Sequence, residues 1–327
     1  MLTVQKEKDR DFLILNLTDT HLSDAEWAPG CEKRRILEGT IRTLMERVRP
    51  DLVTVSGDLS YIGNARAYEM LADFLDSFGV PWAPVWGNHD DEEGPEAVER
   101  VVRGYLKHPL CLYERGPAEL GNGNYVIVVE EEGRPAEGLL MMDSHDRETF
   151  TGADGKPYED YARLLPAQLD WMKEQIRALS AAGCADTTLI LHMPIYAYRS
   201  AAEAALRAGI DGRAVTKEEA DGTGVWNPGY EASFGLWREG ICSPPVDEGA
   251  FDVLLEGGTT RHVIAGHDHV NTFAIPYRGI WLCYGLKTGT GSYWEEGING
   301  GTVLRVTSRG VAEVRHEFVD ITPWRDE

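Results

Sequence analysis

The stretch Phe12–His21, with the sequence FLILNLTDTH, is the most informative for the fold of this chain. It begins with a short apolar run, which is typical of a strand buried on both faces of a parallel sheet. Asp19 and His21 follow where this strand is expected to end. Ligands of open α/β sheets bind at the carboxyl ends of strands. The stretch therefore predicts an α/β sheet with a polar site at one edge.

The segments that follow alternate between helical and strand patterns. Residues 32–49 and 65–78 carry apolar side chains at helical spacing, and a short apolar run follows each of them, at 52–55 and 82–86. This β-α-β-α-β order predicts parallel strands with right-handed crossovers. Further along, the pattern predicts a strand pair, an amphipathic helix, a buried strand and a series of short strands, at 124–130 with 138–143, 166–180, 187–192 and 261–319.

The composition is that of a folded globular protein. Apolar residues make up 43% and charged residues 26% of the 327 residues, which is close to ordinary usage. We expect a single domain over residues 1–327, with a loop-rich insertion at about 194–245 that carries aromatic residues such as Trp226. The five cysteines are dispersed, no apolar run could span a membrane and the first residues lack a signal-peptide pattern, so we expect a cytoplasmic protein.

The net charge is strongly negative. The chain has 32 Lys and Arg against 54 Asp and Glu, which gives a formal charge of −22. Such a chain repels nucleic acids and anionic membranes unless it carries a local basic stripe, and the sequence has no such run. We therefore expect neither nucleic acid nor membrane as a partner. Most of the acidic surplus is interpreted as surface solvation, and a few acids as metal ligands.

Four further motifs also place polar residues directly after an expected strand. They are Gly57-Asp58, Gly87-Asn88-His89-Asp90, His192 and Gly266-His267-Asp268-His269. Because alternate residues of an extended chain face one side, His267 is expected to point with His269, and Asp19 with His21. Glycines allow the backbone to turn sharply near a bound ion. A set of Asp, Asn and His donors without thiolates suits Mn, Fe, Zn or Mg.

In their order, the five motifs resemble the pattern D-x-H, G-D, G-N-H-[DE], H, G-H-x-H of the calcineurin-like binuclear metallophosphoesterases. The resemblance covers residues 19–269. It implies an α/β fold of two mixed β-sheets packed as a sandwich and flanked by helices. It also implies two divalent metal ions and hydrolysis of a phosphate ester by direct attack of a metal-bridging hydroxide.

Carried over to this sequence, the resemblance implies a role for each matching residue. Asp19, His21, Asp58 and His269 would hold one ion, and Asp58, Asn88, His192 and His267 would hold the other. His89 would protonate the leaving oxygen or stabilise charge on the phosphoryl group, and both Asn88 and His89 would contact substrate. Asp90 would orient His89, as carboxylates commonly do for an imidazole.

The segment Gly57–Tyr61 is similar to the G-D-x-x-Y motif of purple acid phosphatases, in which the tyrosine binds ferric iron. Segments 240–243 and 281–285 look like those of the intracellular-type relatives of these enzymes. True purple enzymes have D-x-G at the first motif, where this chain has His21. Tyr61 is therefore either a metal ligand or an aromatic neighbour of the site.

The expected substrate is a small phosphate monoester. Two divalent ions bring four positive charges and Asp19 and Asp58 remove two, so the site would be a positive focus in a negative chain. Two alternatives stay open. One is a phosphodiesterase acting on a nucleotide or cyclic nucleotide, and the other is a non-catalytic metal-binding scaffold.

Overall fold

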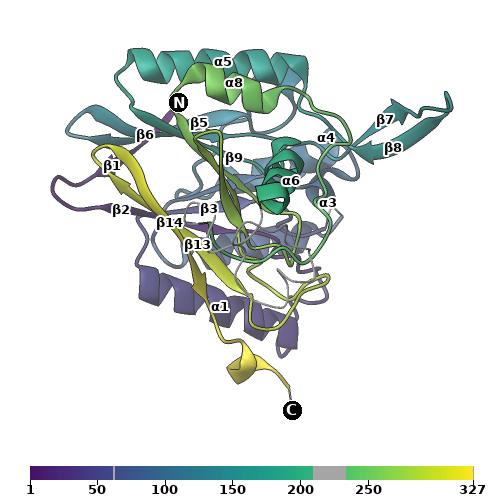
Figure 1. Cartoon of the computed structure of the whole chain (residues 1–327). Helices are drawn as coiled ribbons and strands as arrows, with labels where there is room; N and C mark the ends of the chain where they lie inside the picture. Colours follow the sequence, from purple (N-terminus) through teal and green to yellow (C-terminus); the bar gives the residue numbers. More distant parts are fainter. Residues whose placement is uncertain (62, 209–232, 327) are drawn as a thin grey trace.

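The computed structural model describes residues 1–61, 63–208 and 233–326. Two mixed β-sheets lie face to face, and helices cover their outer faces (Figure 1). The larger sheet has the strand order β1-β5-β6-β9-β10-β12-β11, and the smaller sheet has the order β14-β13-β2-β3-β4. A separate hairpin, β7–β8, projects from the body of the molecule. The predicted sandwich of two mixed sheets is confirmed.

The strands of the larger sheet are β1 (Leu2–Lys6), β5 (Tyr125–Glu131), β6 (Arg134–Met141), β9 (Asp186–Ile190), β10 (Thr260–Ala265), β11 (Ala274–Tyr277) and β12 (Ile280–Tyr284). Those of the smaller sheet are β2 (Phe12–Leu17), β3 (Leu52–Ser56), β4 (Trp82–Val85), β13 (Gly300–Thr307) and β14 (Gly310–Phe318). The hairpin consists of β7 (Arg147–Thr151) and β8 (Pro157–Tyr161).

The described helices are α1 (Glu32–Val48), α2 (Ala65–Asp76), α3 (Asn88–Asp91), α4 (Pro95–Tyr105), α5 (Pro166–Ala181), α6 (Ala197–Ala208) and α8 (Ala250–Gly257), with short 3₁₀ turns η1 (Ala118–Leu120) and η2 (Thr322–Trp324). In Figure 1, α5 and α8 lie on the side of the larger sheet, and α1 lies on the opposite side of the molecule. The expected helices at 32–49, 65–78 and 166–180 correspond to α1, α2 and α5.

Strands β2, β3 and β4 run parallel, as the alternation of the first hundred residues predicts. Their register pairs Leu17 with Val55 and Val55 with Pro84, so the three carboxyl ends lie at the same edge. In the larger sheet, β9 and β10 are also parallel neighbours. The five motifs thus follow strands from both sheets.

Side chains on the two faces of β6 pack into two different hydrophobic clusters. Leu139 and Met141 belong to a cluster that also contains Leu304 of the smaller sheet, so they pack between the sheets. Leu140 points to the other face and joins a second cluster with Met172 and Ile176 of α5. Because both faces of β6 are buried at its carboxyl end, residues 139–141 form an uninterrupted apolar run.

The segment 194–245 is only partly irregular. Its first part forms helix α6, where Ala201, Ala202 and Ala205 are buried against the larger sheet's outer cluster. Small alanines allow this close packing, and they also weaken the apolar periodicity from which a helix is recognised. Trp226 and the rest of 209–232 lie outside the described residues, so the expected insertion stays a prediction there.

All five cysteines are free thiols, in agreement with their dispersed spacing. Within the described parts of the chain, no helix combines the length and the apolar character needed to cross a membrane.

Glu137 of β6 is a buried carboxyl group that ties the two sheets together. Its Oε1 accepts a hydrogen bond from Thr188 Oγ1 at 2.9 Å, and its Oε2 accepts one from the backbone N–H of Val311 at 3.1 Å. Burial raises the pKa of Glu137 to about 8. The folded chain therefore binds a proton that the unfolded chain releases at lower pH, and stability falls as the pH rises towards 8.

We predict that Glu137→Gln stabilises the protein at alkaline pH, since the amide keeps hydrogen-bonding capacity without a buried charge. The gain in the free energy of unfolding should be on the order of 1–3 kcal/mol at pH 9 and much smaller at pH 5. Denaturant unfolding at both pH values measures it, with Glu46→Gln on the exposed side of α1 as the control. A gain in the free energy of unfolding that is the same at both pH values would contradict the raised pKa of Glu137.

Candidate metal centre

The five motifs meet at the edge where the two sheets come together. Asp19 and His21 follow β2, Asp58 follows β3, and the Asn88 segment follows β4. The larger sheet adds His192 after β9, and His267 and His269 after β10. Six of the seven predicted ligands, Asn88 excepted, fall into two groups of Asp and His side chains that share Asp58.

The first group consists of Asp19, His21, Asp58 and His269, whose nearest donor atoms all lie within 4.8 Å of one another. His21 Nε2 lies 3.1 Å from Asp58 Oδ2 and 3.1 Å from His269 Nε2. His269 Nε2 in turn lies 3.1 Å from Asp19 Oδ1. Two imidazole nitrogens and two carboxylate oxygens thus face a common centre.

The second group consists of Asp58, His192 and His267. His192 Nε2 lies 3.2 Å from Asp58 Oδ2, 3.3 Å from His267 Nδ1 and 3.2 Å from the side-chain oxygen of Asn88. The same Asp58 oxygen therefore faces His21 in the first group and His192 in the second. This is the position expected of a carboxylate that bridges two ions.

Metal ions would satisfy the donor atoms of the cluster better than hydrogen bonds among these atoms do. Asp19 Oδ1 is buried and forms no hydrogen bond within the described chain, although His269 Nε2 is close. Its other oxygen is satisfied, because Oδ2 accepts from Thr18 Oγ1 at 2.8 Å and from the N–H of His267 at 3.2 Å. A buried carboxylate oxygen without a donor is costly, and a cation would remove that cost.

Hydrogen bonds to the backbone hold two of the imidazoles in the orientation that a metal requires. His192 Nδ1 lies 2.9 Å from the carbonyl of Ser56, and His269 Nδ1 lies 2.8 Å from the carbonyl of Tyr293. A carbonyl only accepts, so Nδ1 carries a proton in both residues, and Nε2 is the nitrogen that faces the cluster.

The charges of the cluster are those of a cation site. Burial raises the pKa values of Asp19 and Asp58, but the surrounding histidines outweigh it and hold both well below the usual range. Burial and the nearby charge of His192 lower the pKa of His267 to about 3, and burial with Lys287 lowers that of His269 to about 4. Burial lowers the pKa values of His192 and His21, but Asp58 outweighs it, raising that of His192 to about 9 and that of His21 above its usual value. Ionised carboxylates and neutral imidazoles are the forms that bind metals, so an ion at this site would displace the extra protons of His192 and His21.

The backbone brings these side chains together in a way that differs from the prediction. Asp19, His21, Asp58 and His267 all have positive φ angles, of 54°, 45°, 50° and 75°. The chain is therefore not extended at these motifs, and the predicted alternation of side chains is wrong there. Asp19 and His21 nevertheless converge. Left-handed conformations are uncommon for residues other than glycine, and their clustering at one site indicates strain held by the surrounding sheets.

Comparison with known proteins agrees with this geometry. Residues 12–271 match the family described as calcineurin-like phosphoesterase. The chain belongs to the calcineurin-like phosphoesterase family.

The relatives of this chain differ in the activities that their names state. "Probable inactive purple acid phosphatase 14" of Arabidopsis thaliana is 27% identical over 324 residues, covering 88% of this chain and 73% of the relative. A protein of Synechococcus sp. named as a probable cyclic nucleotide phosphodiesterase is 37% identical over 183 residues, covering 55% of this chain and 57% of the relative. A dimetal phosphatase from Danio rerio has the same fold, with a TM-score of 0.54 at 14% identity over 93% of this chain and 98% of that one.

His89 lies at the mouth of the cluster. Its backbone N–H donates to Asp58 Oδ1 at 3.0 Å, and its ring lies 5.3 Å from that of His21. Its side chain is 34% exposed, and its Nδ1 lies 2.5 Å from Glu92 Oε1. Its Nε2 forms no hydrogen bond within the described chain and is open to a substrate.

The expected pairing of Asp90 with His89 is not found. Asp90 is buried and accepts hydrogen bonds from Tyr68 Oη at 2.6 Å and from the N–H groups of Gly87 at 2.8 Å, Leu59 at 3.3 Å and Ser60 at 3.3 Å. It therefore ties the loop after β3 to the loop after β4. Successive residues of a helix point in different directions, whereas residues three apart are neighbours, so Glu92 contacts His89 instead.

Tyr61 packs against the site through its ring. Its centroid lies 5.1 Å from that of His21 and 5.3 Å from that of His89. Burial raises its pKa, which disfavours the tyrosinate in the absence of a metal. Tyr61 is thus an aromatic neighbour of the site, and its role as a metal ligand stays a prediction.

Lys287 is a buried cation beside the cluster that the motifs do not reveal. Its Nζ donates to the backbone carbonyl of Asp19 at 2.9 Å. Burial lowers its pKa to about 8 despite the opposing effect of Asp19 and Asp58. It lies far outside the five motifs in sequence, and a lone lysine in an apolar stretch carries no signal of its own.

A polar cavity of about 200 Å³ opens above the cluster. Its wall contains Asp58, Asn88, His89, Glu92, Asp146, Arg147, Tyr161, Cys242, His267, Asp268, His269, Ser292 and Tyr293. Asp146, Arg147 and Tyr161 come from the base of hairpin β7–β8, which the sequence patterns did not predict.

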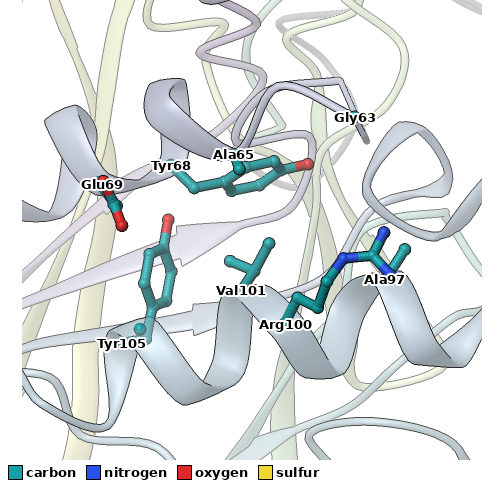
Figure 2. A pocket seen from close by; sticks show the side chains of 9 residues that line it. Gly63, Ala65, Tyr68, Glu69, Ala97, Arg100, Val101 and Tyr105 are labelled. Atoms are coloured by element: carbon teal, nitrogen blue, oxygen red, sulfur yellow. The ribbon is translucent and has the colours of Figure 1, made fainter.

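A second cavity, of about 170 Å³, lies between α2 and α4 and is separate from the cluster. Figure 2 shows Tyr68 on one helix facing Val101 and Tyr105 on the other. The hydroxyl of Tyr68 is the group that reaches Asp90. This cavity therefore lies behind the metal centre and contains none of its donors.

Gly87 permits the close approach of the loops after β3 and β4. A Cβ atom at this position would lie 2.2 Å from Asp58 Oδ1 and 2.4 Å from the Asp58 backbone nitrogen. Non-bonded atoms do not approach so closely, so the carboxylate of Asp58 would have to move.

We predict that Gly87→Ala weakens metal binding about tenfold to a hundredfold, because Asp58 loses its position. Metal content after dialysis measures the loss, and circular dichroism checks the fold. Gly104→Ala on α4 is the matched control, since a Cβ there has nothing within 4 Å. Equal metal content in both variants would show that the packing of Gly87 does not hold the site.

Proposed function

We propose that this phosphoesterase hydrolyses small phosphate monoesters with the help of two divalent metal ions. The observation that carries the proposal is the pair of donor groups that share Asp58 Oδ2, with the open Nε2 of His89 at their mouth. The donor set contains oxygen and imidazole nitrogen and suits Mn, Fe, Zn or Mg.

Each residue has a defined task in this proposal. Asp19, His21 and His269 complete one site, and Asn88, His192 and His267 complete the other. When bound, paired ions lower the pKa of a water that they share and neutralise charge on phosphoryl oxygens. Asn88 and His89 hold the phosphoryl group, and His89 delivers a proton to the leaving oxygen. Glu92 keeps Nδ1 of His89 protonated, which leaves Nε2 as the nitrogen that transfers the proton.

The size and charge of the site favour a small substrate. A cavity of about 200 Å³ is smaller than the pockets that enclose drug-sized ligands. With a formal charge of −22, the chain would repel a long polyanion. We therefore propose a small phosphorylated molecule as the partner, without nucleic acid or membrane. The five free thiols are consistent with the proposed cytoplasmic location.

A phosphodiesterase is the second candidate, because the Synechococcus relative is named for cyclic nucleotides. A scaffold without activity is the third, because the Arabidopsis relative is named inactive. The presence of every expected donor and of His89 in this chain favours an enzyme over a scaffold.

Hydrolysis of p-nitrophenyl phosphate and of bis-p-nitrophenyl phosphate, each with Mn, Fe, Zn and Mg, tests the proposal. We expect the metal-free protein to be inactive, about two metal equivalents to restore activity, and the monoester to be preferred. A preference for the diester would favour the second candidate. Nucleotides are tested with the same metals. If neither the two esters nor the nucleotides are hydrolysed with any metal, the scaffold is favoured.

His89→Asn is predicted to lower kcat by about 10² to 10⁴ while two metal equivalents remain bound, because a proton-transfer group is lost and no ligand is removed. Glu92→Gln should lower kcat less and change its pH profile. Glu93→Gln, at the next and exposed position, should leave kcat unchanged. If His89→Asn instead lost metal at full specific activity per metal, His89 would have no role in proton transfer.

A further inference from the structure

The base of hairpin β7–β8 places a cation and an aromatic ring at the mouth of the metal centre. Arg147, the first residue of β7, is paired in register with Tyr161, the last residue of β8. Directly opposed residues of an antiparallel pair lie on the same face. Both side chains line the cavity above the cluster, while the rest of the hairpin projects from the body of the molecule (Figure 1).

Tyr161 connects this arginine to the metal centre. Its ring lies edge-on to that of His267, with centroids 4.6 Å apart and planes at 87°. The guanidinium carbon of Arg147 lies 5.1 Å from the centre of the Tyr161 ring. The Tyr161 ring thus lies between the guanidinium and His267, which is a predicted metal ligand. The face of this ring binds the guanidinium by a cation–π contact.

Among the described residues, none accepts a hydrogen bond from the guanidinium of Arg147. Its guanidinium forms no side-chain hydrogen bond within the described chain, and its one carboxylate contact there is Asp146, at 4.0 Å. Arg163, at the other side of the same hairpin base, contrasts with it, because its Nε and its terminal nitrogen both bind the carboxylate of Glu148. Arg147 keeps its planar set of donors available, which is the group that matches a carboxylate or phosphate.

The cavity wall around Arg147 carries several carboxyl groups. Glu92, Asp146 and Asp268 contribute carboxyl groups to the wall, and Arg147 is its one Lys or Arg among the described lining residues. A leaving group with a negative charge would be repelled by such a wall unless one cation received it. An arginine held on a ring beside the reacting centre provides that cation.

We propose that Arg147, supported by Tyr161, forms a subsite for a second anionic group, so that the preferred substrates are phosphate monoesters whose leaving group carries a carboxylate or a second phosphate. The proposal rests on the phosphoesterase activity proposed above and names its substrate class. Arg147 selects the substrate, and the metal donors with His89 act on the ester. The backbone bond from the N–H of Ala162 to the carbonyl of Asp146, at 3.1 Å, closes the base of the hairpin and holds the subsite in place.

The first experiment compares phenyl phosphate with 4-carboxyphenyl phosphate and with 1,4-phenylene bisphosphate. We expect the wild-type protein to favour at least one of the anionic substrates by about tenfold or more in kcat/KM, since charge-assisted hydrogen bonds are the strong ones. The better of the two distinguishes a carboxylate from a phosphate. Arg147→Gln should abolish the preference and leave phenyl phosphate hydrolysis within about twofold of wild type.

Lys156→Gln is the matched control, because it removes one positive charge from the exposed tip of the same hairpin. It should keep the preference. Arg147→Lys should retain part of it, since an ammonium keeps the charge and loses the fork of donors. A preference that survives in Arg147→Gln, or is equally lost in Lys156→Gln, overturns the subsite.

Binding without turnover separates this proposal from the proposed function. Calorimetry of the metal-loaded protein with benzylphosphonate and 4-carboxybenzylphosphonate should show tighter binding of the carboxylated compound in wild type and equal binding in Arg147→Gln. If no ester is hydrolysed but this difference is seen, the phosphoesterase proposal fails and the subsite stands. If esters are hydrolysed and the two phosphonates bind equally to wild type, the subsite is wrong and the proposed function stands.

Discussion

A carboxylate buried as deeply as that of Asp58 raises the free energy of the folded chain unless donors and cations surround it. The protein meets this requirement from both sheets. The N–H of His89 donates to Oδ1, while His21 and His192 approach Oδ2 from opposite groups. Two ions sharing this oxygen would complete the neutralisation. The loops after five strands are arranged around this one group, and so is the cavity above it.

Holding that arrangement requires backbone conformations that a short peptide would not keep. Four of the predicted ligands have positive φ angles, and Gly87 allows the loop after β4 to pass against Asp58. Asp90 joins the two loops through four hydrogen bonds, including one from Tyr68 of α2. The packed core of the two sheets holds these strained conformations in place. The site accordingly lies at the edge of buried strands.

The structure also shows how a negative protein could bind the anionic substrate proposed for it. The acids are spread over the surface, whereas the predicted metal donors are concentrated at one edge. Around them, Lys287 lies below the cluster and Arg147 lies at its mouth. Lys287 and Arg147 thus add two cations to a site whose wall also carries carboxyl groups, and Arg147, through the proposed subsite, would offer its charge to the leaving group.

The sequence patterns were sufficient for the parallel strands and for the residues that meet at their edge, because apolar runs and strand-end motifs are local patterns. The two packed sheets were predicted only through the family resemblance. It assigned Asp90 to His89 wrongly, since the partner depends on the helical turn that brings Glu92 alongside. Arg147, Tyr161 and Lys287 could be placed only by the tertiary structure. They come from segments without a motif, and only the folding of the hairpin and of the chain after β12 brings them to the cluster. Local periodicity determined the strands and helices, and long-range packing decided which charges face the cavity.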